Sequence, residues 1–236
     1  MILISLFFSQ MVFAATETQN FSAKGLREVE VENGSGKVVV NATGAAEATV
    51  VVDKRKISSS CVVTVRRDGN KLVAKAEQTG HWSSKNVCEV DFTLRVPKAV
   101  DLDLEVGNGN VSVEGTEGEL DFKLGNGDLV AKGAFRKVDG NSGNGKTTIH
   151  GLLGEAEVKS GNGALELQYA APPAAGELEL KIGNGDATVR FPKGSQVRTE
   201  FVGALGKLTN QLGDTPSAAF QVKAKAGTGN LTVQAY

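Results

Sequence analysis

The stretch "GNSGNGKT" at residues 140–147 points to a specific chemistry, because it satisfies the phosphate-binding formula G-x-x-x-x-G-K-[ST]. In a true phosphate loop a strand precedes these residues and a helix follows them, and the helix N-terminus holds the phosphates. The residues that follow here, "TIHGLLGE", belong instead to a β-strand unit that recurs along the chain. We therefore interpret the match as a by-product of a repeat and predict no nucleotide site at Lys146.

Nucleophilic or metal chemistry needs side chains that this sequence scarcely has. The histidines are His81 and His150, both expected at the surface, and the cysteines are Cys61 and Cys88. No Ser/His/Asp or Cys/His set follows from their spacing, so the sequence predicts no enzyme and no catalytic, cofactor or metal residues. Two cysteines in a strand-rich exported chain favour a Cys61–Cys88 disulfide. A free reactive thiol or half of a zinc site is the alternative, but companion ligands are missing.

A repeated tripeptide shows which elements must position any functional residue. Gly-Asn-Gly recurs at intervals of 18, 18, 18 and 22 residues, at 107–109, 125–127, 143–145, 161–163 and 183–185. Between these points apolar residues alternate with polar ones, as at Val111 and Val113, and a period of two indicates strands. A coil of two short strands cannot bury its inner face alone. We therefore expect an all-β protein in which the coils stack as a parallel β-solenoid, about 18 residues per coil, with strands about 4.8 Å apart.

The asparagines of the tripeptides are expected to stack at one corner of the coils. Glycine supplies the backbone angles of a sharp turn, and the asparagines either hydrogen-bond along the axis or hold left-handed turns. A row of ligand carbonyls is the functional alternative, without independent support. The residues of this predicted structural ladder are Asn108, Asn126, Asn144, Asn162 and Asn184.

Coils rich in Gly, Asn and Asp also resemble the calcium-binding β-roll, whose repeat carries an aspartate two residues after its second turn glycine. Calcium requires oxygen ligands, and carboxylates are missing from the equivalent positions. We therefore predict no ordered calcium at these turns. The equivalent residues are Val111, Leu129, Thr147, Leu165 and Ala187.

One outward position of successive coils is always acidic. Stacking places these like charges side by side, and lysines two residues further along offset part of the repulsion. Such a row either forms a solubilising face or binds a cationic partner. The candidate interaction face, which we call the acidic column, consists of Asp103, Asp121, Asp139, Glu157 and Glu179.

Two stretches depart from the repeat. Residues 50–100 contain a predicted antiparallel hairpin with Asp68-Gly69-Asn70 at its turn, and residues 201–219 also leave the pattern. The corner signal nevertheless recurs near residue 33 and at the C-terminal end. We therefore expect one domain over residues 15–236, with an antiparallel excursion at 50–100 and the regular coils at 101–236.

The first residues carry a targeting signal. Residues 1–14 hold an apolar run, with Val12 and Ala14 at the spacing of a signal-peptidase site, which predicts export and removal of this segment. No later stretch approaches the ~20 apolar residues of a membrane span, so no transmembrane segment is expected in the mature chain. The formal net charge of −1, from 26 basic and 27 acidic residues, gives no nucleic-acid footprint.

The segments "RVPKAVDLDLEVGNGNVSVEGTEGELDFKLGNGDLVAKG", "VRFPKGSQVRTEFVG" and "GTGNLTVQ" together resemble the bacterial adhesin-like families of DUF4097-type β-strand repeat proteins. The resemblance covers most of the mature chain. It implies an extracytoplasmic β-solenoid with roles in adhesion or envelope interactions, and it implies no catalytic residues.

The sequence thus predicts a non-enzymatic protein, exported to the periplasm or cell surface, that presents flat charged faces to an envelope or extracellular partner such as a cationic peptide. A glycan-binding or glycan-active β-helical protein is the alternative. A sugar binder needs exposed aromatic side chains, and the candidates outside the signal and the inward positions are Trp82, Tyr169 and Tyr236. The sequence names neither the ligand nor the oligomeric state.

Overall fold

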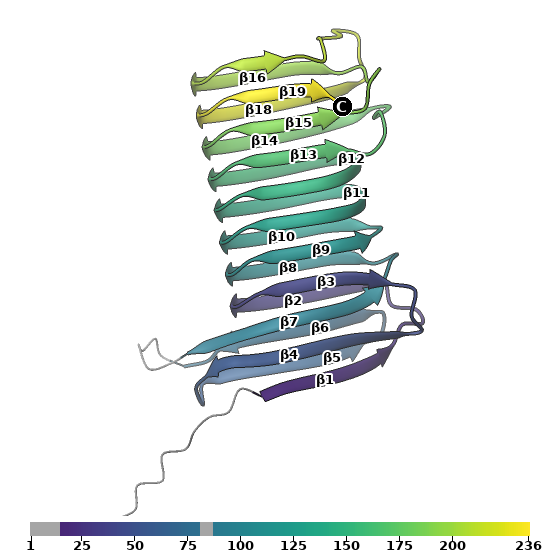
Figure 1. The fold of residues 1–236 in the computed structure, drawn as a ribbon, viewed down its shortest axis with the longest axis vertical. Helices are drawn as coiled ribbons and strands as arrows, with labels where there is room; N and C mark the ends of the chain where they lie inside the picture. The colour runs from purple at the N-terminus through teal and green to yellow at the C-terminus, as the bar shows by residue number, and fades with distance from the viewer. Residues whose placement is uncertain (1–14, 81–86) are drawn as a thin grey trace, which may run out of the picture.

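The computed structural model describes residues 15–80 and 87–236, and it is all-β, as the sequence predicts (Figure 1). Its strands join one 19-stranded sheet that wraps around a hydrophobic core. Within these described residues no helix is long and apolar enough to cross a membrane. The predicted signal peptide at 1–14, together with His81 and Trp82, lies outside the described residues.

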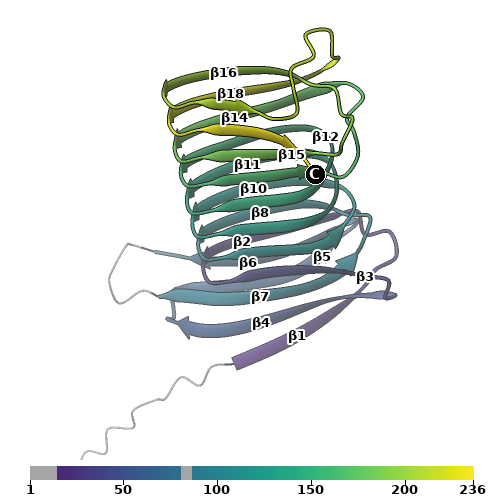
Figure 2. The same ribbon diagram turned by 45° about the horizontal axis from the view of Figure 1, so that its top comes forward.

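The sheet folds into two facing walls that enclose the core (Figures 1 and 2). The first wall contains β2 (Glu28–Ser35), β8 (Asp101–Asn108), β10 (Glu119–Asn126), β14 (Gly176–Asn184), β18 (Phe220–Thr228) and β16 (Arg198–Leu205). The second wall contains β3 (Val38–Thr43), β9 (Val111–Thr116), β13 (Leu165–Tyr169), β15 (Ala187–Phe191), β19 (Leu231–Ala235) and β17 (Leu208–Asn210). The long strands β11 (Leu129–Asn144) and β12 (Thr147–Asn162) bend from the second wall into the first.

Neighbouring strands within each wall pair in parallel, and equivalent residues of successive repeats lie side by side. Leu102, Leu120 and Val138 are aligned on β8, β10 and β11, for example. Because side chains alternate along a strand, this register sends every second residue of each coil into the core. The result is a continuous apolar interior, with Phe122 and Leu104 almost completely buried. Residues one repeat apart in the sequence therefore lie next to each other on neighbouring strands, and similar residues form columns along the stack.

The corner between the walls depends on close approach of glycine backbones. The N–H of Gly109 donates to the carbonyl of Asn126 at 2.8 Å, and the N–H of Gly127 donates to the carbonyl of Asn144 at 2.9 Å. Gly109 has a φ of 150° and Gly127 a φ of 134°, which only glycine adopts readily. No non-glycine residue in the described part of the chain has a positive φ. The left-handed alternative for the asparagines is therefore wrong.

The order of the coils along the axis differs from their order in the sequence at both ends. The coil of β2 and β3 lies between β8/β9 and the pair β6 (Lys71–Gln78) and β7 (Cys88–Pro97). At the other end the coil of β18 and β19 lies between β14/β15 and β16/β17. The two stretches that leave the sequence pattern thus supply the outer layers of the stack.

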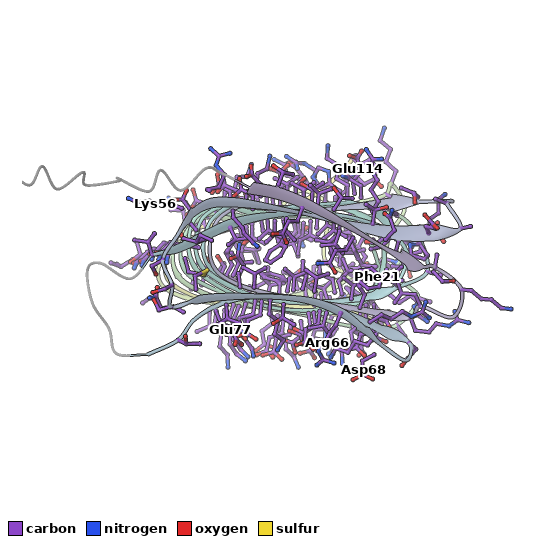
Figure 3. The ribbon with its side chains drawn as sticks, turned by 90° about the horizontal axis from the view of Figure 1, so that it is seen from below. Phe21, Lys56, Arg66, Asp68, Glu77 and Glu114 are labelled. Atoms are coloured by element: carbon purple, nitrogen blue, oxygen red, sulfur yellow. A yellow bond between two sulfur atoms is a disulfide. The ribbon has the colours of Figure 1, made fainter. Side chains whose placement is uncertain are left out.

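The N-terminal end is closed by antiparallel pairing. β5 (Cys61–Asp68) forms a hairpin with β6, while β4 (Glu47–Ile57) pairs with both β7 and β1 (Ala15–Ser22). The predicted Cys61–Cys88 disulfide is confirmed and links β5 to β7. Viewed from this end, Phe21 lies between the walls, whereas Arg66 and Glu114 lie outside them (Figure 3).

The corner geometry predicts a large difference between two Gly→Ala substitutions. A Cβ added at Gly143 would lie 2.3 Å from the carbonyl oxygen of Gly125, whereas a Cβ at Gly44 meets no atom within 4 Å. We expect Gly143→Ala to lower the free energy of unfolding by about 1 to 3 kcal/mol, the usual cost of overpacking. Gly44→Ala should change it by less than about 0.5 kcal/mol, as ordinary surface changes do. Urea denaturation of both variants measures the difference, and equal losses would contradict this account of the corner.

Candidate functional site

The acidic column lies on the outer surface of the first wall, one residue from each strand. Pairing aligns Asp103 with Asp121, Asp121 with Asp139, Asp139 with Glu157, and Glu157 with Glu179. All five side chains point away from the core because their neighbours in sequence are buried. The column continues at its N-terminal end into Glu30, which is aligned with Asp103. The column predicted from the sequence did not include Glu30, because this residue precedes the regular repeats.

Lysines neutralise both ends of the column. Glu30 contacts Lys71, and its carboxylate also lies 2.6 Å from the ammonium of Lys75. At the other end, Glu157 lies 2.8 Å from Lys159 and 3.1 Å from Lys181. Glu179 also contacts Lys181, at 2.9 Å.

These hydrogen bonds lower the pKa of Glu30 and of Glu157, which lie on either side of the centre of the column. The pKa of Glu30 falls because Lys71 and then Lys75 donate to its charged form. The pKa of Glu157 falls because Lys159 and then Lys181 do the same. Both carboxylates therefore remain ionised and paired, which leaves them little capacity for another cation.

The centre of the column has a different electrostatic state. Among the described residues, Asp103, Asp121 and Asp139 form no ion pair within 4.0 Å. Partial burial raises the pKa of Asp121, and the adjacent charges of Asp103 and Asp139 raise it further, while the charges of Lys123 and Lys137 offset part of this rise. Three carboxylates in register, none of them ion-paired with a described lysine or arginine, thus define the candidate site, which we call the aspartate triplet.

The row two residues further along the first wall changes sign along the stack. Glu105, Lys123, Asn141, Lys159 and Lys181 are aligned there on successive strands. Lys123 lies 3.7 Å from the carboxylate of Glu105, so it is directed toward its own row. The lysines that form ion pairs with the acidic column lie beside its glutamates, whereas Lys123 and Lys137 act on Asp121 only as nearby charges.

The asparagine ladder is formed by direct side-chain hydrogen bonds. Each amide nitrogen donates to the amide oxygen of the coil before it, at 2.8, 2.7, 2.9 and 2.8 Å, through Asn108, Asn126, Asn144, Asn162 and Asn184. Two residues after three of the ladder positions a second side chain caps the corner: Asn110 accepts from the N–H of Asp128 at 2.9 Å, and Asp128 and Asp186 accept in the same way. The side-chain oxygens of the ladder are thus engaged by their neighbours, which supports a structural role.

The phosphate-loop pattern and the calcium-equivalent positions both lack the required surroundings. The segment after Lys146 is the strand β12, so no helix N-terminus faces residues 140–147. The ammonium of Lys146 lies 2.7 Å from the carboxylate of Glu166. The positions equivalent to calcium ligands are all buried in the core. Within residues 15–80 and 87–236, no group of three or more His, Cys, Asp or Glu residues is arranged to hold a metal ion.

A second charged cluster, on the second wall, was not foreseen. Glu166 accepts from Lys146 and Arg190, and His150 Nε2 lies 3.8 Å from its carboxylate. Hydrogen bonds from Lys146 and then Arg190 lower the pKa of Glu166 to about 2. Lys146, Glu166 and Arg190 occupy different positions of three successive repeats, so only diagonal comparison of the aligned repeats could have indicated their contacts. His150 lies on the outer face with 33% of its side chain exposed, at the outward position expected from the sequence.

Carbohydrate binding would require exposed aromatic side chains, so the exposure of the two tyrosines is relevant to it. Tyr169, expected from the sequence to be available on a face, is completely buried. Its ring stacks on Phe191 at 4.7 Å and meets the edge of Phe220 at 5.4 Å. Tyr236 is 48% exposed, but its hydroxyl donates to the carbonyl of Tyr169 at 2.7 Å. The described residues therefore offer no exposed pair of tyrosines.

Comparison with known proteins shows similarity at the level of fold. A putative adhesin from Bacteroides fragilis superposes with a TM-score of 0.53, at 14% identity over 93% of this chain and 97% of that chain. A putative adhesin from Parabacteroides merdae gives a TM-score of 0.48, at 13% identity over 94% and 96%. A putative cell adhesion protein from Clostridium sporogenes gives 0.42, at 13% identity over 95% and 100%.

No protein-family model matches the chain, and neither does any curated protein sequence. The structural neighbours carry the adhesin description that the sequence resemblance named, whereas nothing in the comparisons tests the DUF4097 assignment. At 14% identity the Bacteroides fragilis protein shows a shared fold alone. The site must therefore be interpreted from its own geometry.

The aspartate triplet predicts a stabilising Asp121→Asn substitution. The folded-state pKa of Asp121 is raised above its ordinary value of 3.8, so its cost is absent below that pH and appears as pH rises through the raised pKa. At pH 7 we expect Asp121→Asn to raise the free energy of unfolding by about 0.2 to 0.5 kcal/mol, typical of an exposed cross-strand charge pair. Denaturation at pH 7 and pH 3 measures this, and a loss of stability at pH 7 would contradict it.

Glu166→Gln should have the opposite effect. Because the pKa of Glu166 is lowered from 4.5 to about 2, its contribution is present above pH 4.5 and is lost as pH falls toward 2. We expect the variant to be about 1 kcal/mol less stable than the parent at pH 7, the upper range for exposed ion pairs. The two chains should converge near pH 2. An undiminished difference at that pH would show that the side chain contributes through packing instead of charge.

Proposed function

We propose that the chain is an exported, non-enzymatic β-solenoid that binds a cationic partner at the cell envelope through the aspartate triplet. The observation that carries this proposal is the contrast within the acidic column. Lysines pair with Glu30, Glu157 and Glu179, whereas Asp103, Asp121 and Asp139 form no ion pair within the described chain. If the row served only to solubilise the surface, there would be no reason for lysines to pair with its glutamates and not with its three central aspartates.

The spacing of the triplet defines the kind of partner. Adjacent strands lie about 4.8 Å apart, so the triplet spans about 10 Å along the axis. An extended peptide advances about 6.6 Å for every second residue, so two lysine or arginine side chains on one side of it fall within that span. We therefore propose a basic segment of an envelope or extracellular protein as the partner.

Export is supported by the disulfide and by the apolar segment at residues 1–14. A bond between Cys61 and Cys88 persists in oxidising compartments such as the periplasm or the cell surface. The fold shared with the Bacteroides fragilis protein, itself described as a putative adhesin, agrees with a role in surface interactions. Burial of Tyr169 gives the glycan-binding alternative less support.

The proposal predicts that Asp103→Asn/Asp121→Asn/Asp139→Asn loses binding to a lysine-rich peptide. Three exposed charge pairs of about 0.5 kcal/mol each correspond to an affinity about tenfold weaker. The affinity of the parent should fall steeply with salt, because the Debye length is only about 8 Å at physiological ionic strength. Fluorescence anisotropy with labelled peptide at low and physiological salt measures both effects.

Glu157→Gln/Glu179→Gln is the matched control, because it removes two charges of the same column that lysines already neutralise. This variant should bind the peptide nearly as tightly as the parent, and any weakening should be much smaller than the tenfold loss of the triple variant. If the triple variant binds as tightly as the parent, or if the parent binds no basic peptide at low salt, the triplet is only a solvated face.

A further inference from the structure

The two ends of the stack are protected to different degrees. At the N-terminal end the edge strands are antiparallel, and the outermost strand β1 exposes Thr16, Glu17 and Thr18. The pairing of β4 with β7 is also interrupted by an irregularity between Lys54 and Lys56. Polar side chains and irregular pairing are common means of preventing strands from adding to a sheet edge.

The C-terminal end is protected less completely. Within the described residues, β16 pairs only with β18, and β17 pairs only with β19, so both walls end in parallel strands with a free edge (Figure 1). Every residue from 202 to 209 is exposed. The side of β16 near Thr199 is partly covered, because Asp214 accepts from the Thr199 N–H at 2.7 Å and Leu212 packs on the core.

Outward positions that are polar in the preceding coils become apolar in this last coil. Val202 is aligned with Lys225, which is aligned with Lys181, and Val202 is 57% exposed. Leu205 continues the asparagine ladder beyond Thr228 and is 71% exposed. A shallow groove of about 720 Å³ along the glycine corner also ends at Val202, Gly203 and Ala204. The change of residue type occurs where the edge is open, and exposed apolar edges favour association.

We propose that the C-terminal coil is the interface through which two copies of this chain associate end to end. We call its exposed apolar residues Val202, Leu205 and Leu208 the end patch. A partner that covers the end must continue both walls at once, which a single extended peptide cannot do. The N-terminal end of another copy is unsuitable because its edges are antiparallel and polar. A second C-terminal coil, related by a two-fold axis, presents two matching edges and the same apolar patch.

Charge also permits this contact. Residues 197–219 carry Arg198 and Lys207 against Glu200 and Asp214, so the end has no net charge. A two-fold contact reverses the direction of the partner's strand, and the positive and negative side chains of one copy can then face those of opposite sign in the other. Because the remaining end of each copy is closed, association stops at a dimer and does not continue into a fibre.

The test is sedimentation of the purified chain over a range of concentrations, with the double variant Val202→Lys/Leu205→Asn. This variant restores the residue types that the same positions carry in preceding coils, at Lys181 and Asn184. The matched control is Val62→Lys/Leu153→Asn, which makes the same chemical changes at residues exposed by 46% and 42% elsewhere. We expect a dimer for the parent and the control, and a monomer with unchanged circular dichroism for the end-patch variant.

Hydrogen exchange of the parent gives a measurement that does not depend on a variant. Amides of residues 202–209 should be protected at high protein concentration and should lose that protection on dilution. A parent that remains monomeric at every concentration would overturn the proposal, even if a strand of a different protein covers the C-terminal coil. A dimeric end-patch variant, or loss of the dimer in the control, would overturn it as well.

Discussion

Parallel hydrogen bonding between glycine-containing corners is the constraint on which the rest of the structure depends. Each corner N–H donates to the carbonyl of the next coil, as from Gly145 to Asn162 at 3.0 Å and from Gly163 to Asn184 at 2.9 Å. The backbones approach so closely that a side chain at these glycines would meet a carbonyl oxygen. Once this contact fixes one coil relative to the next, every other residue of the repeat acquires a fixed neighbour. The asparagine ladder and the buried core follow from that register.

The same register imposes an electrostatic cost. Five carboxylates of the repeat are aligned along one wall, where separation by a single strand spacing makes like charges repel. The chain relieves this repulsion at the ends of the column through Lys71, Lys75, Lys159 and Lys181. It leaves repulsion in place at Asp121, where burial first and then the charges of Asp103 and Asp139 raise the pKa. Repulsion retained only in the centre is the physical basis for proposing a cationic partner there.

Local patterns allowed much of the fold to be predicted. The alternation of apolar residues indicated strands, the repeated tripeptide indicated the corners, and cysteine chemistry indicated the Cys61–Cys88 disulfide that the structure contains. The order of the coils at both ends could not be predicted in this way. The strand sequences do not determine that β18 lies between β14 and β16, because any coil with alternating apolar residues can pack beside any other. The position depends on how connecting segments of different lengths reach across the end.

The sequence allowed the acidic column to be predicted, but not that only its three central aspartates would lack ion pairs. Aligned repeats identified the five acidic positions, whereas the pairing of Glu157 depends on which way long lysine side chains extend, and several directions are open to them. The Glu166 cluster was missed for a related reason, since its members lie on diagonals across three coils. Tyr169 was misplaced although alternation with the buried Leu165 and Leu167 already directs it into the core, where its ring stacks on Phe191.

The central claim is that successive coils stack in register and thereby align the acidic column. Double electron–electron resonance measures this most directly, as the distance between spin labels attached at Asp103→Cys and Glu179→Cys with the native disulfide kept intact. These positions are four strand steps apart, so the account predicts a narrow distance distribution centred near 20 Å, four times the ~4.8 Å strand spacing. A broad distribution, or a mean separation beyond about 30 Å, would contradict in-register stacking of these strands.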